Sequence, residues 1–345
     1  MTDGHEISRA PVAALDCGTN STRLLIVAPG GQVLERRMRI TRLGEGVDAT
    51  RKLSPEAMAR TLDVLREYRS LLQRYGVARA RLVATSAARD AANAEEFLAA
   101  AADACGIEPE LLSGEEEGAL SFAGATAGLA PDAVGPGPVL VVDIGGGSTE
   151  LVAGVAPTRT ASAAVSSDVP PAATEAAAGG PHRLSPVVVS LDMGCVRVTE
   201  RFLHHDPPTP DELARARAAA AAELMRARAV LPPLAPGGLL VGLAGTVSTL
   251  AMLHLGIPQD AYDRERVHHA VLERGDVERW LEVLAHEPRA RRLARTGMVR
   301  GREDVIVGGV LLLAEVMAVF DRERCLVSED DILDGLVASL VEDVA

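Results

Sequence analysis

Two short segments, far apart in the sequence, each place an aspartate just before a turn that contains glycine and hydroxyl residues. Residues 12–27 have the sequence VAALDCGTNSTRLLIV, and residues 139–155 have the sequence VLVVDIGGGSTELVAGV. Superposing the two aligns Asp16 with Asp143. Each copy is an apolar run, an aspartate, a tight turn and a second apolar run, which is typical of a β-hairpin. This internal repeat predicts two related structural units, each with an aspartate beside a turn rich in N–H donors.

The second turn, Gly145-Gly146-Gly147-Ser148-Thr149, has the composition of an anion-binding site. Glycine lets the backbone N–H groups approach an anion closely, and serine and threonine add hydroxyl donors. A single turn of this kind is more often a plain link between two strands. Its repetition after Asp16 and Asp143 favours a functional role, with two phosphate sites and two carboxylates facing each other.

The carboxylates of the repeat are the candidate metal ligands. Mg²⁺ in proteins takes one or two carboxylates together with water and phosphate oxygens, and Asp16 and Asp143 suit that role. Glu150, directly after the second turn, is a candidate for a further ligand. The alternative for all three is a carboxylate that only accepts hydrogen bonds from the local backbone. For Glu150 the sequence leaves both interpretations open.

Six segments occur in an order that resembles the exopolyphosphatase/guanosine pentaphosphate phosphohydrolase (Ppx/GppA) family in its short two-domain form. They are DCGTNSTR, ATSAARDA, SGEEEG, VVDIGGGSTEL, SLDMGCVRVTERF and GLAGTVSTL. The resemblance spans most of the chain, and the ordered set is specific although no single segment is. It implies an α/β fold of two ribonuclease-H-like domains, of the actin-like ATPase superfamily, with a cleft between them.

The resemblance also implies site residues. The expected phosphate-binding residues are Gly18, Asn20 and Ser21 in the first turn, Gly145, Gly146, Gly147, Ser148 and Thr149 in the second, and Arg89 in the TSAARD segment. The catalytic glutamate of the family corresponds to Glu117 in SGEEE, where it would orient and deprotonate the attacking water. Acidic residues in a first helical turn are also favoured by the helix dipole without any catalytic role. For Arg89 the alternative is a surface ion pair with Asp90.

The function expected from this resemblance is that of an exopolyphosphatase, which hydrolyses the terminal phosphate from inorganic polyphosphate with Mg²⁺. The alternatives are a phosphohydrolase acting on the 5′ end of guanosine pentaphosphate (pppGpp), and a weakly active protein that binds polyphosphate or the alarmone. A kinase of the same superfamily would need an acceptor pocket and an adenine site, and the sequence shows neither clearly. A homodimer is expected by resemblance.

The elements that must position these residues alternate between strands and helices. Helices are predicted from Ser54-Pro55 to Gly76, after Ser113-Gly114, from Thr209-Pro210, over 246–255, around 303–320 and from Asp331. The predicted domains are residues 1–115 with the C-terminal helix at about 331–345, and residues 116–330, with 156–186 as a flexible loop. The turn at 243–248 is predicted to hold distal phosphates or to pack a helix on a sheet. Arg289, Arg292 and Arg295, with nearby Arg300 and Arg302, are predicted either to guide a polyanion or to form a solvated helix face.

Composition narrows the class of protein. The chain has 345 residues, enough for two domains, and its 48% of hydrophobic residues are dispersed, so no membrane span is expected. Four widely spaced cysteines form no CxxC pair, which argues against a zinc site or a disulfide framework and predicts buried thiols. A net charge of −13 argues against nucleic acid as a partner. The N-terminus lacks the pattern of a secretory signal, so a cytoplasmic location is expected.

Overall fold

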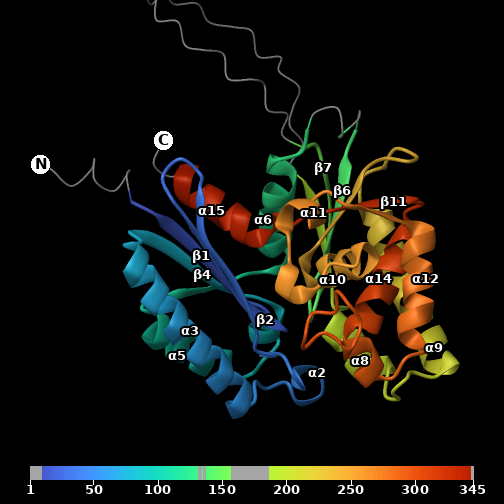
Figure 1. The fold of residues 1–345 in the computed structure, drawn as a ribbon, viewed down its shortest axis with the longest axis horizontal. Helices are drawn as coiled ribbons and strands as arrows, with labels where there is room; N and C mark the ends of the chain where they lie inside the picture. The colour runs from blue at the N-terminus through green and yellow to red at the C-terminus, as the bar shows by residue number, and fades with distance from the viewer. Residues whose placement is uncertain (1–9, 131–133, 135–136, 157–185, 343–345) are drawn as a thin grey trace, which may run out of the picture.

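The computed structural model describes residues 10–130, 134, 137–156 and 186–342 (Figure 1). The loop predicted at 156–186 lies outside the described residues except at its two ends. The described chain forms two α/β units side by side. The first unit comprises the β1–β5 sheet with the helices on it, and the second comprises the β6–β11 sheet with its own helices.

The first sheet has five strands in the order β3-β2-β1-β4-β5. β1, β2 and β3 are antiparallel neighbours, whereas β1, β4 and β5 run parallel. The strands are β1 (Val12–Cys17), β2 (Ser21–Val27), β3 (Val33–Ile40), β4 (Arg79–Ala84) and β5 (Pro109–Leu111). The predicted hairpin is therefore formed by β1 and β2, in a register that places Asp16 opposite Arg23.

The second sheet repeats this order and adds one strand at its edge. Its order is β10-β11-β9-β6-β7-β8, in which β6, β7, β8, β9 and β11 correspond to β1 to β5. The strands are β6 (Val139–Ile144), β7 (Thr149–Gly154), β8 (Val187–Leu191), β9 (Leu240–Leu243), β10 (Val271–Glu273) and β11 (Arg324–Val327). The expected fold class, two ribonuclease-H-like units, is confirmed.

Two helices cover one face of the first sheet (Figure 1). α3 (Pro55–Tyr75) has the predicted ends, since the Ser54 side chain accepts a bond from the N–H of Ala57 and Gly76 ends the helix with a φ of 63°. α5 (Ala94–Cys105) packs beside it through a core that includes Tyr68 and Phe97. Two short helices, α2 (Val47–Thr50) and α4 (Ser86–Arg89), lie in the segments that follow β3 and β4.

The other face of the first sheet is covered by the last helix of the chain. α15 (Ile332–Glu342) packs its Leu336 and Leu340 against β1, β2 and β4, and it also lies against α6 (Gly114–Ala127) (Figure 1). A Cβ at Gly124 would lie 2.0 Å from the Asp331 carbonyl oxygen, so α6 and α15 meet where only glycine fits. The predicted boundary at residue 115 falls in the first turn of α6 and stays a prediction.

Most helices of the second unit pack on one face of its sheet in a shared apolar core, and α6 packs on the other face. Besides α6, the helices of this unit are α8 (Cys195–Phe202), α9 (Pro210–Val230), α10 (Ala244–Leu255), the 3₁₀ helix η1 (Gln259–Ala261), α11 (Arg264–Val267), α12 (Arg274–Ala285), α13 (Arg289–Leu293) and α14 (Ile306–Val319). The predicted cap at Thr209 is confirmed as a capping box with Glu212. The helix predicted around 303–320 begins later, at Ile306. Among the described helices, none combines the length and apolar character that a bilayer span requires.

Candidate active site

A cleft between the two units is lined by both turns of the sequence repeat. The first turn contributes Gly18, Asn20 and Ser21, and the second contributes residues 145–148. Asp16 and Asp143, at the ends of β1 and β6, lie on the same lining. The structure therefore brings together the two turns and the two aspartates that the repeat predicted to face each other.

The two turns touch, and glycine permits this contact. A Cβ added to Gly146 would lie 2.8 Å from Cβ of Thr19, and one added to Gly147 would lie 2.4 Å from Oγ of Ser86. Real Cβ atoms do not tolerate such distances, so these positions need glycine for the close approach of the backbones. Gly145, Gly146 and Gly147 also carry no side chain that would cover their backbone at the cleft.

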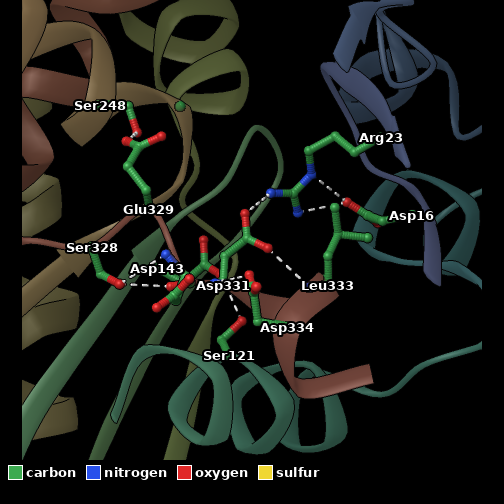
Figure 2. A network of polar contacts seen from close by, with 12 residues as sticks. Asp16, Arg23, Ser121, Asp143, Ser248, Ser328, Glu329, Asp331, Leu333 and Asp334 are labelled. Carbon is green, nitrogen blue, oxygen red and sulfur yellow. Dashed lines mark hydrogen bonds and ion pairs between the residues drawn. The ribbon is translucent and has the colours of Figure 1, made fainter. Parts of the chain in front are cut away.

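Asp16 is almost fully buried, with 2% of its surface exposed, and only one of its carboxylate oxygens has a partner. Arg23 donates to Oδ2 from Nε at 2.9 Å and from Nη2 at 2.7 Å, whereas Oδ1 is buried without a hydrogen bond. Burial raises the pKa of Asp16, although Arg23 opposes the shift. Arg23 also pairs with Asp331, which precedes α15 (Figure 2).

Asp143 occupies the matching place in the second unit. Its Oδ2 accepts a hydrogen bond of 2.7 Å from the hydroxyl of Ser121 on α6, as Figure 2 shows. Burial raises the pKa of Asp143 to about 6, and the bond from Ser121 opposes that shift. The aspartate is thus held by a neutral donor, and no described arginine or lysine forms an ion pair with it.

Glu150 lies behind the cleft, in β7 opposite Asp143. Its side chain is fully buried, with Oε1 accepting a bond of 2.8 Å from Ser190 and Oε2 lacking any hydrogen bond. Burial raises the pKa of Glu150 to about 8, assisted by the charge of Asp143. Glu150 is not among the described residues that line the cleft, so Asp16 and Asp143 are better placed to meet a ligand there.

Glu117 is the glutamate of the SGEEE segment that lines the cleft. Its neighbour Glu116 forms a capping box with Ser113 at the start of α6, and Glu115 is exposed. Burial, followed by the charges of Glu150, Asp143 and Asp16, raises the pKa of Glu117 well above its ordinary value. A buried carboxyl group among other carboxylates is a strong base once it has lost its proton.

Arg89 contacts Glu117 instead of forming the surface pair considered from the sequence. Its Nη1 lies 3.5 Å from Oε2 of Glu117 and donates to the Leu112 carbonyl oxygen at 2.7 Å. The alternative of an ion pair with Asp90 is wrong, because Asp90 pairs with Arg197. Arg89 is not among the described residues on the cleft lining, and its phosphate role stays a prediction.

The hydroxyl groups of the second turn have different surroundings. Ser148 lines the cleft, whereas the hydroxyl of Thr149 donates to the Met193 carbonyl oxygen at 2.5 Å. Thr149 therefore fixes the segment before α8, and its availability to a phosphate is reduced. Gly145, Gly146 and Gly147 line the cleft as predicted.

Two described arginines line the cleft, of which Arg23 was not predicted from the sequence and Arg302 was predicted only as a neighbour of the arginine stripe. Arg23 lies in β2 among apolar residues, and that position was its only signal. Nη1 of Arg302 donates to Thr249 at 2.9 Å and to the Gly245 carbonyl oxygen. Burial lowers the pKa of Arg302 to about 10. Thr85, Ser86 and Thr246 add hydroxyl groups to the lining.

The predicted arginine stripe is instead divided among separate ion pairs. Arg292 is buried and pairs with Asp206, Arg295 pairs with Glu287 at 2.6 Å, and α13 is only five residues long. A continuous solvated helix face does not form, and these contacts leave little charge for guiding a polyanion.

The buried carboxylates repel one another, and a divalent cation bound between them would remove this repulsion. Asp16 and Glu150 each bury an oxygen without a partner, and Asp143 and Glu117 add two further acids. Within the described residues, no group of three or more His, Cys, Asp or Glu residues has the geometry of a metal cluster. Mg²⁺ needs only one or two carboxylates when phosphate oxygens and water complete its shell, so this arrangement fits it.

Comparison with known proteins relates the chain to phosphatases. A model of the Ppx/GppA phosphatase family matches residues 25–343. Exopolyphosphatase 2 of Mycobacterium tuberculosis is 40% identical over 346 aligned residues, which cover 95% of this chain and 98% of that protein. The crystal structure of an exopolyphosphatase-like protein has a TM-score of 0.81 and 32% identity, covering 97% of this chain and all of that one. The Aquifex aeolicus member of the Ppx/GppA family has a TM-score of 0.73 and 30% identity, covering 97% and 98%.

Proposed function

This chain belongs to the Ppx/GppA phosphatase family, whose members hydrolyse phosphoanhydride bonds, and on that premise we propose that it is an exopolyphosphatase. It releases the terminal phosphate of inorganic polyphosphate to water. The observation that carries the proposal is that both glycine turns and Glu117 line a single cleft. A relative that is 40% identical over nearly its whole length bears the name exopolyphosphatase.

In this proposal one set of residues binds the substrate and another transfers a proton. The N–H groups of the two turns bind the oxygens of the terminal and adjoining phosphates, with Asn20, Ser21 and Ser148 as further donors. Glu117 accepts the proton of the attacking water, and its buried setting makes it a strong base. Little covalent chemistry is required of the protein, because phosphoryl transfer depends mainly on positioning and on charge.

Mg²⁺ is the cofactor we propose for this site. Asp16 and Asp143 would hold it from either side of the cleft, with Glu150 behind them. When bound, Mg²⁺ neutralises negative charge on the phosphate oxygens during the reaction. Without such a cation, the polyphosphate would meet the three acidic side chains of the cleft lining, Asp16, Glu117 and Asp143. Asp16 is paired with Arg23 and Glu117 with Arg89, whereas Asp143 has no ion pair among the described residues.

The space next to the cleft supports polyphosphate as the substrate. A hollow of about 460 Å³ adjoins the cleft and shares Arg23, Ala244, Gly245 and Arg302 with its lining. Arg36, Arg37 and Arg39 of β3 also line it. Glu329 and Asp331 line the hollow as well, and Arg23 and Arg36 are paired with acids. Arg37 and Arg39 are about half exposed, so these two would hold the distal phosphates of a chain whose end is in the cleft.

The same hollow offers one observation in favour of pppGpp. Met38, Met252, Val299 and Tyr262 contribute apolar surface that a guanine base would contact. The hydroxyl of Tyr262 is already bonded to Glu329, which fixes the ring. Hydrolysis of pppGpp is therefore the second candidate activity. A homodimer and a cytoplasmic location stay predictions.

Phosphate release by the wild type and Glu117→Gln tests the proposal. The assay uses long-chain polyphosphate and pppGpp in parallel, each with Mg²⁺ and with EDTA. We expect Mg²⁺-dependent release from polyphosphate by the wild type and a loss of about 10²–10⁴-fold in Glu117→Gln, the usual size of a general-base contribution. Glu115→Gln is the matched control, because Glu115 is in the same helical turn but exposed.

Three outcomes would overturn parts of this proposal. Release from pppGpp alone would replace polyphosphate by the second candidate. Full activity of Glu117→Gln would remove Glu117 from the mechanism. Binding of both compounds without release would make the chain a binding protein instead of a hydrolase.

A further inference from the structure

Helix α8 starts directly behind the second turn and is bonded to it through the backbone. The N–H groups of Cys195 and Val196 donate at 2.9 Å to the carbonyl oxygens of Gly145 and Gly146, and that of Arg197 donates to Gly146 at 3.2 Å. A Cβ at Gly194 would lie 2.3 Å from the Gly146 carbonyl carbon, so only glycine fits at the junction. The second turn and α8 therefore move as one piece.

The side chains of the same helix reach across to the first unit. Arg197, 5% exposed, pairs with Asp90 and lies 3.3 Å from Oδ1 of Asp48, both in the first unit. Its remaining nitrogen pairs at 3.0 Å with Asp192, just before α8. One turn later, Arg201 donates to Asp48 from Nε at 2.7 Å. Between them, Glu200 accepts the N–H of Gly46 at 3.0 Å.

Asp90 connects the contacts of Arg197 with the cleft. It follows α4, and the hydroxyl of Ser86 at the start of α4 donates to its Oδ2 at 3.4 Å. Ser86 is also the residue that Gly147 approaches so closely that no Cβ fits between them. Arg197 thus links α8, which is bonded to the second turn, to the end of α4, whose Ser86 lines the other side of the cleft.

We propose that Arg197 is a positioning residue that sets the spacing of the two phosphate-binding turns. The cleft is formed by two separate units, so its width depends on contacts that cross between them. Arg197 makes the most buried of the interunit ion pairs beside the turns, and a buried arginine with hydrogen-bonded carboxylates holds a narrow range of geometries. The kinetic consequence rests on the proposed function, whereas the spacing itself does not.

Loss of this spacing should reduce turnover more than binding. Each turn still binds phosphate when the units separate slightly, but water, Glu117 and the terminal phosphate lose their alignment. A displacement of about 1 Å costs on the order of 100-fold in rate. We therefore expect Arg197→Met to lower kcat about 30- to 100-fold and to raise KM less than about 5-fold.

The experiment pairs kinetics on polyphosphate with a distance measurement. Spin labels attached at Ala59→Cys on α3 and Ala290→Cys on α13 report the separation of the units by pulsed electron paramagnetic resonance. Both alanines are exposed, and the four native cysteines are buried, so labelling is selective. We expect one narrow distance distribution in the otherwise unmodified protein and a broader, longer one with Arg197→Met.

Four further variants separate positioning from general loss of structure. Arg201→Met is the matched control, since it removes a cation from the same helix and from Asp48 but does not touch Asp90; it should change kcat less than 3-fold. Arg197→Lys should recover part of the lost kcat. Asp90→Asn keeps the side-chain shape but removes the charge that pairs with Arg197, so it should lower kcat as Arg197→Met does. The double variant Arg197→Met, Asp90→Asn should have a kcat no lower than that of either single variant.

The outcomes are distinct. If Arg197→Met keeps kcat within 3-fold of the wild type, or if its distance distribution is unchanged, the positioning role is refuted. If Arg197→Met does not fold, the kcat and the distance distribution of Asp90→Asn decide whether the positioning role holds. If the wild type releases no phosphate, the proposed function fails, and the distance distributions alone then decide whether Arg197 sets the spacing.

Discussion

Replacing Asp143 with asparagine should stabilise the metal-free protein at pH 8 and leave it nearly unchanged at pH 4. The folded protein holds the Asp143 proton more tightly than the unfolded chain does, because burial raises its pKa from 3.8 to about 6. The sign follows from linkage: the unfolded aspartate ionises near pH 4 and the folded one near pH 6. Stability is therefore lost as the pH rises through that window, and the full cost is present at pH 8.

The size of the effect follows from the same shift. A difference of about two pKa units corresponds to about 3 kcal/mol at 1.36 kcal/mol per unit. Asparagine avoids the ionisation cost and can keep a hydrogen bond with Ser121, but its amide is also buried, so we expect a net gain of about 1–2 kcal/mol. The gain should disappear at pH 4, where the aspartate is already protonated in the folded state.

Urea unfolding in EDTA at pH 8 and pH 4 measures this difference. Asp63→Asn is the control for the substitution itself, because Asp63 is 75% exposed on α3 and should shift stability by less than about 0.5 kcal/mol. Added Mg²⁺ should stabilise the wild type and have less effect on Asp143→Asn, since one proposed ligand is missing. An equal effect at both pH values, or a loss of stability at pH 8, would refute the claim that Asp143 is a costly buried charge.

Two further predictions concern the turns and the arginine-lined hollow. Gly146→Ala should lower kcat/KM for polyphosphate at least about 10-fold, because its Cβ would lie 2.8 Å from Thr19 and push the turns apart. Gly275→Ala is the control for the substitution itself, because a Cβ at Gly275 meets no atom within 4 Å and its φ lies outside the left-handed region. The double variant Arg37→Gln, Arg39→Gln should raise KM about 10-fold for long-chain polyphosphate and hardly change it for tripolyphosphate, because both arginines are about half exposed and line the hollow beyond the cleft. Equal KM changes for both chain lengths would remove the hollow from substrate binding.

The sequence predicted those features of the fold that depend on local patterns. The hairpin repeat was visible because each copy keeps the same order of apolar residues, aspartate and turn within a few residues. Helix ends at Ser54, Gly76 and Thr209 were visible because caps depend on neighbouring residues. The three-residue strand β10 had no such signal, since its length is too short for any periodicity.

The electrostatics of the site could not be predicted in the same way. Arg23 meets Asp331 from the far end of the chain, and Arg197 meets Asp90 from the other unit. Such pairs depend on how the units dock, and no spacing along the chain encodes that arrangement. The family resemblance supplied Glu117, whereas its contact with Arg89 and the unpartnered oxygen of Asp16 are visible only in three dimensions.

The position of α15 has a consequence for the order in which the protein is completed during synthesis. The sheet formed by β1, β2 and β4 is translated well before Ile332, Leu336 and Leu340, which cover one of its faces. Until then that apolar face is available to chaperones or to other nascent chains. Asp331 reaches Arg23 at the same stage, so the first unit's side of the cleft gains its final charge pattern only after the segment that begins α15 has been translated.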